Sequence, residues 1–235
     1  TTGDRNTVYG SEAYRCNATA SDNTAFGYQA MFCNTSGHNN IAVGNALCKN
    51  TSGLYNVAIG SGALSSNTTA NSNVAIGRIA LTANTTGANN IAVGCCALKT
   101  NTTASNNTAV GHDSLKLNTT GTGLVAVGAE AFDANTTASY NTAVGKSSLT
   151  ANTTGAANTA VGFSALKTNT EGDNNVAMGC GALCLNLTGA SNTAIGRNTM
   201  CANTTGANNT AVGLNALLDN TTGDNNVAIG KQALD

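Results

Sequence analysis

Residues 56–77 read NVAIGSGALSSNTTANSNVAIG, a stretch in which the unit Asn-Val-Ala-Ile-Gly begins at Asn56 and again at Asn73. The core of this unit is a β-branched residue, then usually Ala, an apolar residue and Gly, and it starts at residues 7, 24, 41, 57, 74, 91, 108, 125, 142, 159, 176, 193, 210 and 227. Every spacing is 17 except one of 16, between Ile41 and Val57. The pattern predicts a single repeat domain, residues 1–235, without linkers.

One period reads T/V/I-A-V/I-G-x-x-A-L-x-x-N-T-T/S-G/A-x-x-N, and its positions are numbered 1 to 17, with the gap of the short copy placed after Gly44. Positions 1 and 3 are apolar with the period of a strand, and no apolar rhythm of about 3.6 residues is present. The sequence therefore predicts an all-β fold, a parallel β-solenoid or β-roll of about 14 coils of 17 residues. At about 4.8 Å per coil, it would form a rod of roughly 65 Å.

The composition excludes several classes of protein. Asn and Thr occur 36 times each in 235 residues, 41% of the residues are hydrophobic, and only 9% are charged, with a net charge of −1. Disordered chains lack such a content of aliphatic residues. No basic patch is present to bind nucleic acid, and no apolar run is long enough for membrane insertion. The chain begins Thr-Thr-Gly, so we expect a fragment of a longer fibre.

Successive side chains of a strand point to opposite faces, and this alternation predicts which repeat positions are internal. Positions 1 and 3, together with the Leu of position 8, are expected to fill the coil, which leaves position 2 outside. Position 2 is nevertheless Ala in thirteen of fourteen copies, and position 7 is always small. A flat column of small apolar residues is typical of a contact surface. The predicted interface between chains is Ala25, Ala42, Ala58, Ala75, Ala92, Ala109, Ala126, Ala143, Ala160, Ala177, Ala194, Ala211 and Ala228.

The repeat resembles known fibres. Asn56-Val57-Ala58-Ile59-Gly60 and Asn226-Val227-Ala228-Ile229-Gly230 are similar to the repeats of YadA-like heads in trimeric autotransporter adhesins. The variant Asn-Thr-Ala-Val-Gly, at residues 141–145, resembles repeats of phage and bacterial tail-fibre proteins. The resemblance covers all fourteen copies, although the period here is longer than that of the adhesin heads. It implies a left-handed β-roll, a homotrimer and an extended fibre on a cell surface or virion.

The Asn of position 11 has two interpretations. With Ser or Thr at position 13 it forms an N-glycosylation pattern, which would suit a glycosylated extracellular filament or coat protein. Alternatively, the column is a ladder of stacked amides that satisfies backbone groups of the turns. The Asn that precedes the strand in thirteen of the fourteen copies is interpreted in the same way. The asparagines with the glycosylation pattern are Asn17, Asn34, Asn50, Asn67, Asn84, Asn101, Asn118, Asn135, Asn152, Asn186, Asn203 and Asn220.

Columns of Thr at positions 12 and 13 allow another function, ice binding by ranked hydroxyl groups. An ice-binding face needs Thr at alternate positions of a strand, whereas these residues are adjacent and are followed by Gly or Ala. Hydrogen bonding within a turn is therefore the favoured interpretation of the two columns.

Two cysteine pairs occupy equal positions of successive copies, Cys16 with Cys33 and Cys184 with Cys201. Stacked copies would bring each pair within the Cα separation of a disulfide, so both are disulfide candidates. Cys48, Cys95, Cys96 and Cys180 have no stacked partner. No cysteine or histidine spacing suggests zinc, and no metal or cofactor is expected.

The candidate catalytic cluster is His112-Asp113 beside Glu130, with Asp133 nearby, as in a polysaccharide-cleaving β-helix. Charged residues gather at positions 5, 6 and 9, which favours a solvated surface instead. The sequence thus predicts a non-enzymatic structural or adhesive fibre whose main partner is itself, as a homotrimer or filament, and whose variable surface meets a host glycan or protein.

Overall fold

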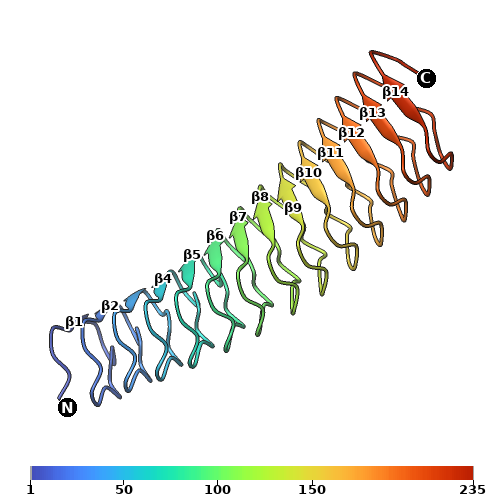
Figure 1. Ribbon diagram of the computed structural model, residues 1–235. Helices are drawn as coiled ribbons and strands as arrows, with labels where there is room; N and C mark the ends of the chain where they lie inside the picture. Colours follow the sequence, from blue (N-terminus) through green and yellow to red (C-terminus); the bar gives the residue numbers. More distant parts are fainter. Residues whose placement is uncertain (1, 235) are drawn as a thin grey trace. The chain divides into compact units, whose positions relative to one another are not determined.

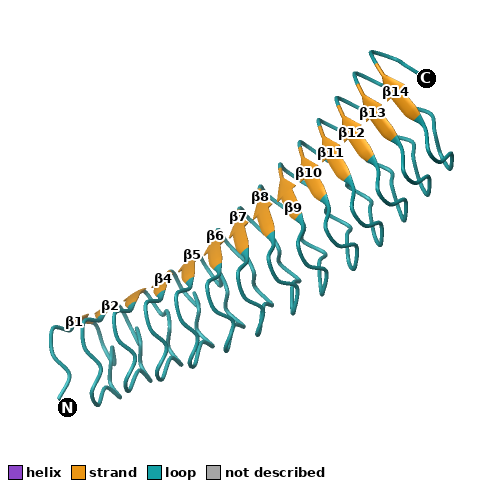
Figure 2. Ribbon diagram, viewed as in Figure 1, coloured by secondary structure: helices purple, strands orange, loops and turns teal. Residues whose placement is uncertain are grey.

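The structure is a computed structural model that describes residues 2–234. It is all-β, with fourteen parallel strands of three residues and no helix among the described residues. Figures 1 and 2 show that each turn of chain carries one strand on one side and loops on the other, the arrangement of a parallel β-solenoid. No helix is present that would be long and apolar enough to cross a membrane in the part of the chain described.

The chain divides into two compact units, Thr1–Thr120 and Gly121–Asp235. The first contains β1 (Thr7–Tyr9), β2 (Thr24–Phe26), β3 (Ile41–Val43), β4 (Val57–Ile59), β5 (Val74–Ile76), β6 (Ile91–Val93) and β7 (Thr108–Val110). The second contains β8 (Val125–Val127), β9 (Thr142–Val144), β10 (Thr159–Val161), β11 (Val176–Met178), β12 (Thr193–Ile195), β13 (Thr210–Val212) and β14 (Val227–Ile229). A single repeat domain over residues 1–235 remains a prediction.

Strands of successive copies pair in parallel within each unit, with equal repeat positions opposite each other. In the first unit Val57 pairs with Val74, Ala58 with Ala75 and Ile59 with Ile76. In the second, Ala177 pairs with Ala194. The register holds through the short copy, because Ile41 pairs with Val57. Equal residues therefore stack in columns, as the repeat predicted.

The turns depend on left-handed backbone at fixed positions. The buried residue of position 8 has positive φ, 49° at Leu98 and 48° at Leu115, and so do residues at positions 6 and 16. Such a conformation is costly for a residue with a Cβ, so it is retained only where the surrounding structure imposes it. Position 4 is more extreme: Gly94 has φ 133°, and a Cβ there would lie 2.5 Å from the carbonyl oxygen of Gly111. Only glycine fits.

The prediction that Ala of position 2 faces outward is wrong. Ala42, Ala75 and Ala92 are fully buried at 0% exposure, as are nearly all their equivalents, whereas Ile91 at position 1 is 41% exposed and Ile76 at position 3 is 37% exposed. The Ala of position 7 is also internal where the copy is enclosed, as at Ala97. The coil is too narrow to hold two β-branched side chains from a three-residue strand, so the strand turns its small residue inward.

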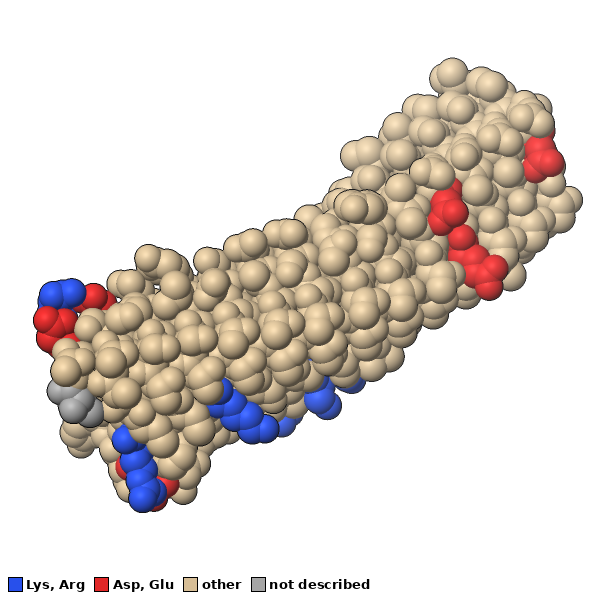
Figure 3. All heavy atoms as spheres, turned by 60° about the horizontal axis from the view of Figure 1, so that its bottom comes forward, with Lys and Arg blue, Asp and Glu red and all other residues tan. Residues whose placement is uncertain are grey.

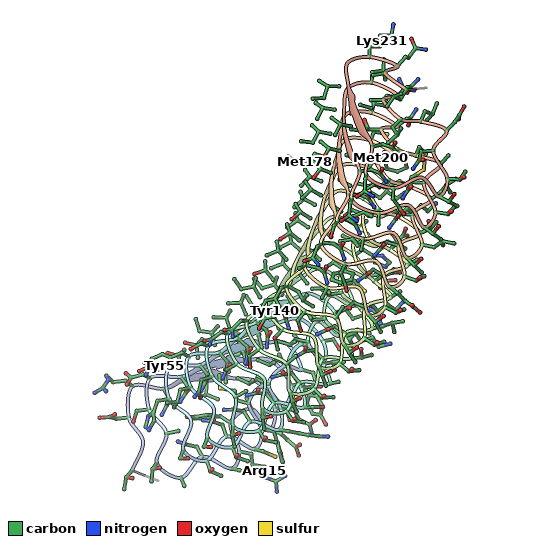
Figure 4. All side chains as sticks on the ribbon, turned by 45° about the vertical axis from the view of Figure 1, so that its right-hand side comes forward. Arg15, Tyr55, Tyr140, Met178, Met200 and Lys231 are labelled. Carbon is green, nitrogen blue, oxygen red and sulfur yellow. A yellow bond between two sulfur atoms is a disulfide. The ribbon has the colours of Figure 1, made fainter. Side chains whose placement is uncertain are left out.

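The core consists of Ala at positions 2 and 7, a large apolar residue at position 8, and Asn at positions 11 and 17. The expectation that position 8 is internal is confirmed, with Leu64, Leu98 and Leu166 fully buried. Figure 4 shows the contrast in the second unit, where Met200 of position 8 lies among the coils and Met178 of position 3 points away from them. Met200 is 0% exposed and Met178 is 42% exposed.

Candidate functional site

The outer strand face, defined as the side chains of positions 1 and 3 of the strands, is the most continuous apolar surface of each unit. In the first unit its central members are Ile41, Val43, Val57, Ile59, Val74, Ile76, Ile91, Val93, Thr108 and Val110. In the second they are Val125, Val127, Thr142, Val144, Thr159, Val161, Val176, Met178, Thr193, Ile195, Thr210 and Val212. All of these side chains are exposed or half-buried. Contiguous apolar patches of this kind mark contact sites on soluble proteins.

This face carries no charge. No Asp, Glu, Lys or Arg occupies position 1 or 3 of any of the fourteen strands. In the view of Figure 3, Lys, Arg, Asp and Glu cover only small parts of the surface. Because paired strands hold their side chains at regular spacing, the outer strand face repeats in every copy.

The Asn column of position 11 is an internal ladder. Asn67 Nδ2 donates to Asn50 Oδ1 at 2.8 Å and to the carbonyl oxygen of Ala70 at 3.1 Å, and the amides of neighbouring copies repeat the arrangement. From Asn34 to Asn203 these side chains are fully buried. Glycosylation needs a free Nδ2, so the glycosylation prediction is wrong for the folded coil and the ladder alternative is confirmed. Asn17 and Asn220 are half-buried, and both hydrogen-bond within their own turn.

The Asn column of position 17 forms a second ladder. Asn73 Oδ1 accepts from the Asn90 backbone N–H at 2.9 Å and from Asn90 Nδ2 at 3.2 Å, while Asn73 Nδ2 donates to the Gly87 carbonyl oxygen at 3.0 Å. The sequence-based ladder is therefore confirmed here too. The positive φ of this turn belongs to the preceding residue, position 16, as at Asn89 with φ 58°.

The Thr of positions 12 and 13 play different parts. The position 12 hydroxyl donates to the carbonyl of the next copy, as from Thr51 Oγ1 to the Thr68 oxygen at 3.0 Å and from Thr85 Oγ1 to the Thr102 oxygen at 3.1 Å. The position 12 hydroxyls thus bind turn backbone as expected, but the bonds join successive copies and do not close a single turn. Position 13 is exposed, as at Thr69 and Thr86, and gives one rank of outward Thr rather than two.

The two disulfide candidates differ. Cys184 and Cys201 form a disulfide with a Cα–Cα distance of 5.0 Å, as predicted. Cys16 and Cys33 are free thiols, so that pairing is not present. Stacking satisfies only the Cα separation of a disulfide, and the bond also needs Cβ atoms that point toward each other. Burial, followed by the nearby Cys16, raises the pKa of the Cys33 thiol. Burial also raises the pKa of Cys48.

The candidate catalytic residues are engaged in separate interactions. Asp113 Oδ2 accepts from Lys116 Nζ at 2.9 Å and lies 3.9 Å from His112 Nδ1. Glu130, in the other unit, accepts from Ser147 at 3.3 Å. Burial opposes ionisation of Asp113, but Lys116 and His112 outweigh it and leave the pKa of Asp113 below its usual value. A general acid of a glycosidase needs the opposite shift. Catalysis by Asp113 and Glu130 finds no support in these interactions.

No cavity is found among residues 2–234, nor any group of three or more His, Cys, Asp or Glu side chains able to hold a metal ion. The sequence reasoning placed positions 1 and 3 inside the coil and therefore missed the outer strand face as an exposed surface. It also missed the charged neighbours of Cys95 and Cys96, which belong to the preceding and following copies and come close only when the copies stack. The chain matches no protein-family model, no curated protein and no solved structure in the three comparisons made.

Proposed function

We propose that the chain is a segment of a non-enzymatic structural fibre whose copies associate through the outer strand face. One observation carries the proposal: in both units, positions 1 and 3 present unbroken columns of exposed or half-buried residues without a charge, most of them Val, Ile or Thr. The interface predicted from the sequence was the Ala column of position 2, which is internal. The proposed interface consists of the columns at positions 1 and 3 of the same strands.

The finer features of the proposed fibre follow from the repeat and from its resemblance to adhesin heads and tail fibres. Each coil holds one period of the repeat and winds with a left hand, and three chains pack around a common axis with their outer strand faces inward. The fibre stands on a cell surface or virion, and variable positions such as 5, 9 and 15 meet a host glycan or protein. Its role is structural, because the number of copies sets the length and stiffness of the fibre.

Sedimentation equilibrium tests the association. The wild-type chain at micromolar concentration is expected to have three times the 23.2 kDa mass of one chain. Ile76→Asp combined with Val93→Asp, both on the outer strand face, is expected to give a folded monomer, because association would bury the carboxylates without partners. Thr86→Asp, on the exposed position 13 column, is the matched control and keeps the wild-type mass. A monomeric wild type, or a dissociated Thr86→Asp protein alone, refutes the proposal.

A second candidate function, ice binding, is favoured by the exposed Thr column of position 13, which includes Thr69 and Thr86. The single rank and the engaged hydroxyls of position 12 weaken it beside the fibre proposal. Thermal hysteresis of the wild-type chain that disappears in a Thr69→Lys, Thr86→Lys protein would establish it, and no hysteresis in the wild type would end it.

A further inference from the structure

Two adjacent cysteines lie just beyond strand β6 in the first unit. Cys95 and Cys96 follow Gly94, and their Sγ atoms are 3.2 Å apart. Cys95 is half-buried and Cys96 is buried. The two sulfur atoms are therefore in contact without being bonded, and a bond between them would close a ring that includes the Cys95–Cys96 peptide. Both are free thiols in the structure.

The stacking of copies surrounds these thiols with opposite charges. The Cys96 backbone N–H donates to the Arg78 carbonyl at 3.1 Å, and the Asp113 N–H donates to the Cys95 carbonyl at 3.1 Å, so the register of the three turns is fixed by backbone bonds. On one side Arg78 Nη2 donates to Cys95 Sγ at 3.5 Å. On the other side the Asp113 carboxylate lies next to Cys96. The pair is therefore asymmetric, with a cation at Cys95 and an anion at Cys96.

Asp113 has an acceptor atom to spare. Its Oδ2 accepts from Lys116 Nζ at 2.9 Å, whereas its Oδ1 is buried and has no hydrogen-bond partner. A buried acceptor without a hydrogen-bond partner is unfavourable, so a thiol hydrogen directed toward it would be stabilised. Burial, then the adjacent Cys95 sulfur and the Asp113 carboxylate, raise the pKa of Cys96. Cys96 consequently keeps its proton at neutral pH, beside the Asp113 carboxylate.

We propose that Cys95 and Cys96 form a reversible dithiol–disulfide site for low-molecular-weight disulfides, in which Cys95 is the attacking residue, Cys96 the resolving residue and Asp113 the residue that positions the Cys96 thiol. The site lies outside the outer strand face and does not depend on the proposed fibre.

The exchange takes place in two steps. In the first, the Cys95 thiolate attacks one sulfur of a disulfide RSSR, a Cys95–SR bond forms, and RS⁻ leaves. In the second, Cys96 gives its proton to the RS⁻ released in the first step and attacks the Cys95 sulfur, which forms the Cys95–Cys96 bond and releases a second RS⁻. After protonation, the two thiols of the protein have been oxidised and one RSSR has been reduced to two RSH.

The resulting bond is expected to be easily reduced. Adjacent residues have Cα atoms about 3.8 Å apart, below the range of about 4.4–6.8 Å that disulfides usually span. The Cys184–Cys201 disulfide, with Cα atoms 5.0 Å apart, lies inside that range. Strained disulfides are the labile and regulatory ones, whereas relaxed ones persist. The chain thus holds one structural and one exchangeable cysteine pair.

Peptide mapping of the whole protein tests the site. Trypsin cleaves after Arg78 and Lys99, and peptide 79–99 contains Cys95 and Cys96 but no other cysteine. After treatment with glutathione disulfide and acid quenching, the wild-type peptide is expected to lose the mass of two hydrogen atoms and to regain it with reduced glutathione. Cys96→Ser is expected to trap glutathione on Cys95. Cys180 is the internal control, because it occupies the same repeat position as Cys95 but is followed by Gly181; it is expected to retain its glutathione.

Rates assign the roles of the neighbours. Arg78→Gln is expected to slow the first step several-fold. Asp113→Asn removes a charge that holds the proton on Cys96, so it is expected to shorten the lifetime of the mixed disulfide several-fold without changing its formation. A wild-type peptide 79–99 that accumulates glutathione as Cys180 does, with no loss of two hydrogen atoms, overturns the site. Equal reaction of Cys95→Ser and Cys96→Ser overturns the assignment of the attacking residue. Because the wild-type peptide is read directly, the test of the site does not depend on the stability of a variant.

Discussion

Removal of one amide from the position 17 ladder is expected to destabilise the coil far more than removal of an exposed amide. In Asn73→Ala the backbone N–H of Asn90 loses its acceptor, Asn73 Oδ1 at 2.9 Å, and stays buried. The Gly87 carbonyl keeps a donor, since Asn84 Nδ2 also reaches it at 2.9 Å, and Asn90 Nδ2 keeps its bond to the Ala104 carbonyl. The loss of stability therefore comes from one buried donor without an acceptor, the Asn90 N–H, and from the other lost hydrogen bonds of the Asn73 side chain.

An orphaned buried group costs about 1–3 kcal/mol, and the other lost hydrogen bonds together add about 1 kcal/mol. We therefore expect Asn73→Ala to lower the free energy of unfolding by about 2–4 kcal/mol. The control is Asn71→Ala, two residues earlier, whose exposed side chain accepts from the Leu54 N–H at 2.7 Å. Water replaces that bond, so its cost is expected to stay within about 1 kcal/mol.

Denaturant unfolding followed by far-UV circular dichroism measures both variants, and hydrogen exchange measures the amide of Asn90 directly. Repeat arrays can unfold in segments, which makes the local measurement necessary. Faster exchange at Asn90 is expected only in Asn73→Ala. Equal losses of stability in the two variants, with Asn90 still protected in Asn73→Ala, would refute the internal ladder.

Ala75→Leu should overpack the coil and cost about 1–3 kcal/mol, whereas Ile76→Leu on the outer strand face should change stability by less than about 0.5 kcal/mol in the dissociated chain; equal denaturation midpoints would contradict this. The φ of Gly94, 133°, suits only glycine. Gly94→Ala should therefore cost at least about 2 kcal/mol, and an unchanged melting temperature would show that the turn adapts. Burial raises the pKa of Tyr14 above its ordinary value of 10.0, so the folded chain holds the proton more tightly than the unfolded chain. Its contribution is present below about pH 10 and is lost as the pH rises through the folded pKa, so stability should fall less in Tyr14→Phe than in the wild type between about pH 9 and pH 11.

The sequence was sufficient to predict the solenoid, the pairing of equal repeat positions and the burial of Leu98 and its equivalents, and it offered the ladder as one of two interpretations of the position 11 Asn. These follow from spacing and from residue types that tolerate few environments. The faces of the strand were not predictable from alternation alone, because a period of two distinguishes two sides without saying which is internal. The stronger signal was the variation in size: position 3 ranges from Val to Tyr9, Phe26 and Met178, whereas position 2 is never larger than Val8, as expected for a side chain packed against a repeated interior.

The surroundings of Cys95 and Cys96 were less accessible from the sequence. Stacking of one copy on the next places Arg78, Cys95 and His112 in one column and Cys96 with Asp113 in the next, and this much could be inferred from the repeat. The distance between the two sulfur atoms and the spare oxygen of Asp113 depend on side-chain rotamers and local burial. Spacing does not determine those, as the free Cys16 and Cys33 also show.

Cross-linking through single cysteines tests the central claim, that copies of the chain meet at the outer strand face. With the six free cysteines replaced by serine, Val93→Cys places one thiol on that face and Thr86→Cys places one on the position 13 column. Mild oxidation is expected to link Val93→Cys chains into covalent pairs and to leave Thr86→Cys chains single. Unlinked Val93→Cys chains, or pairs formed only by Thr86→Cys, would contradict the account.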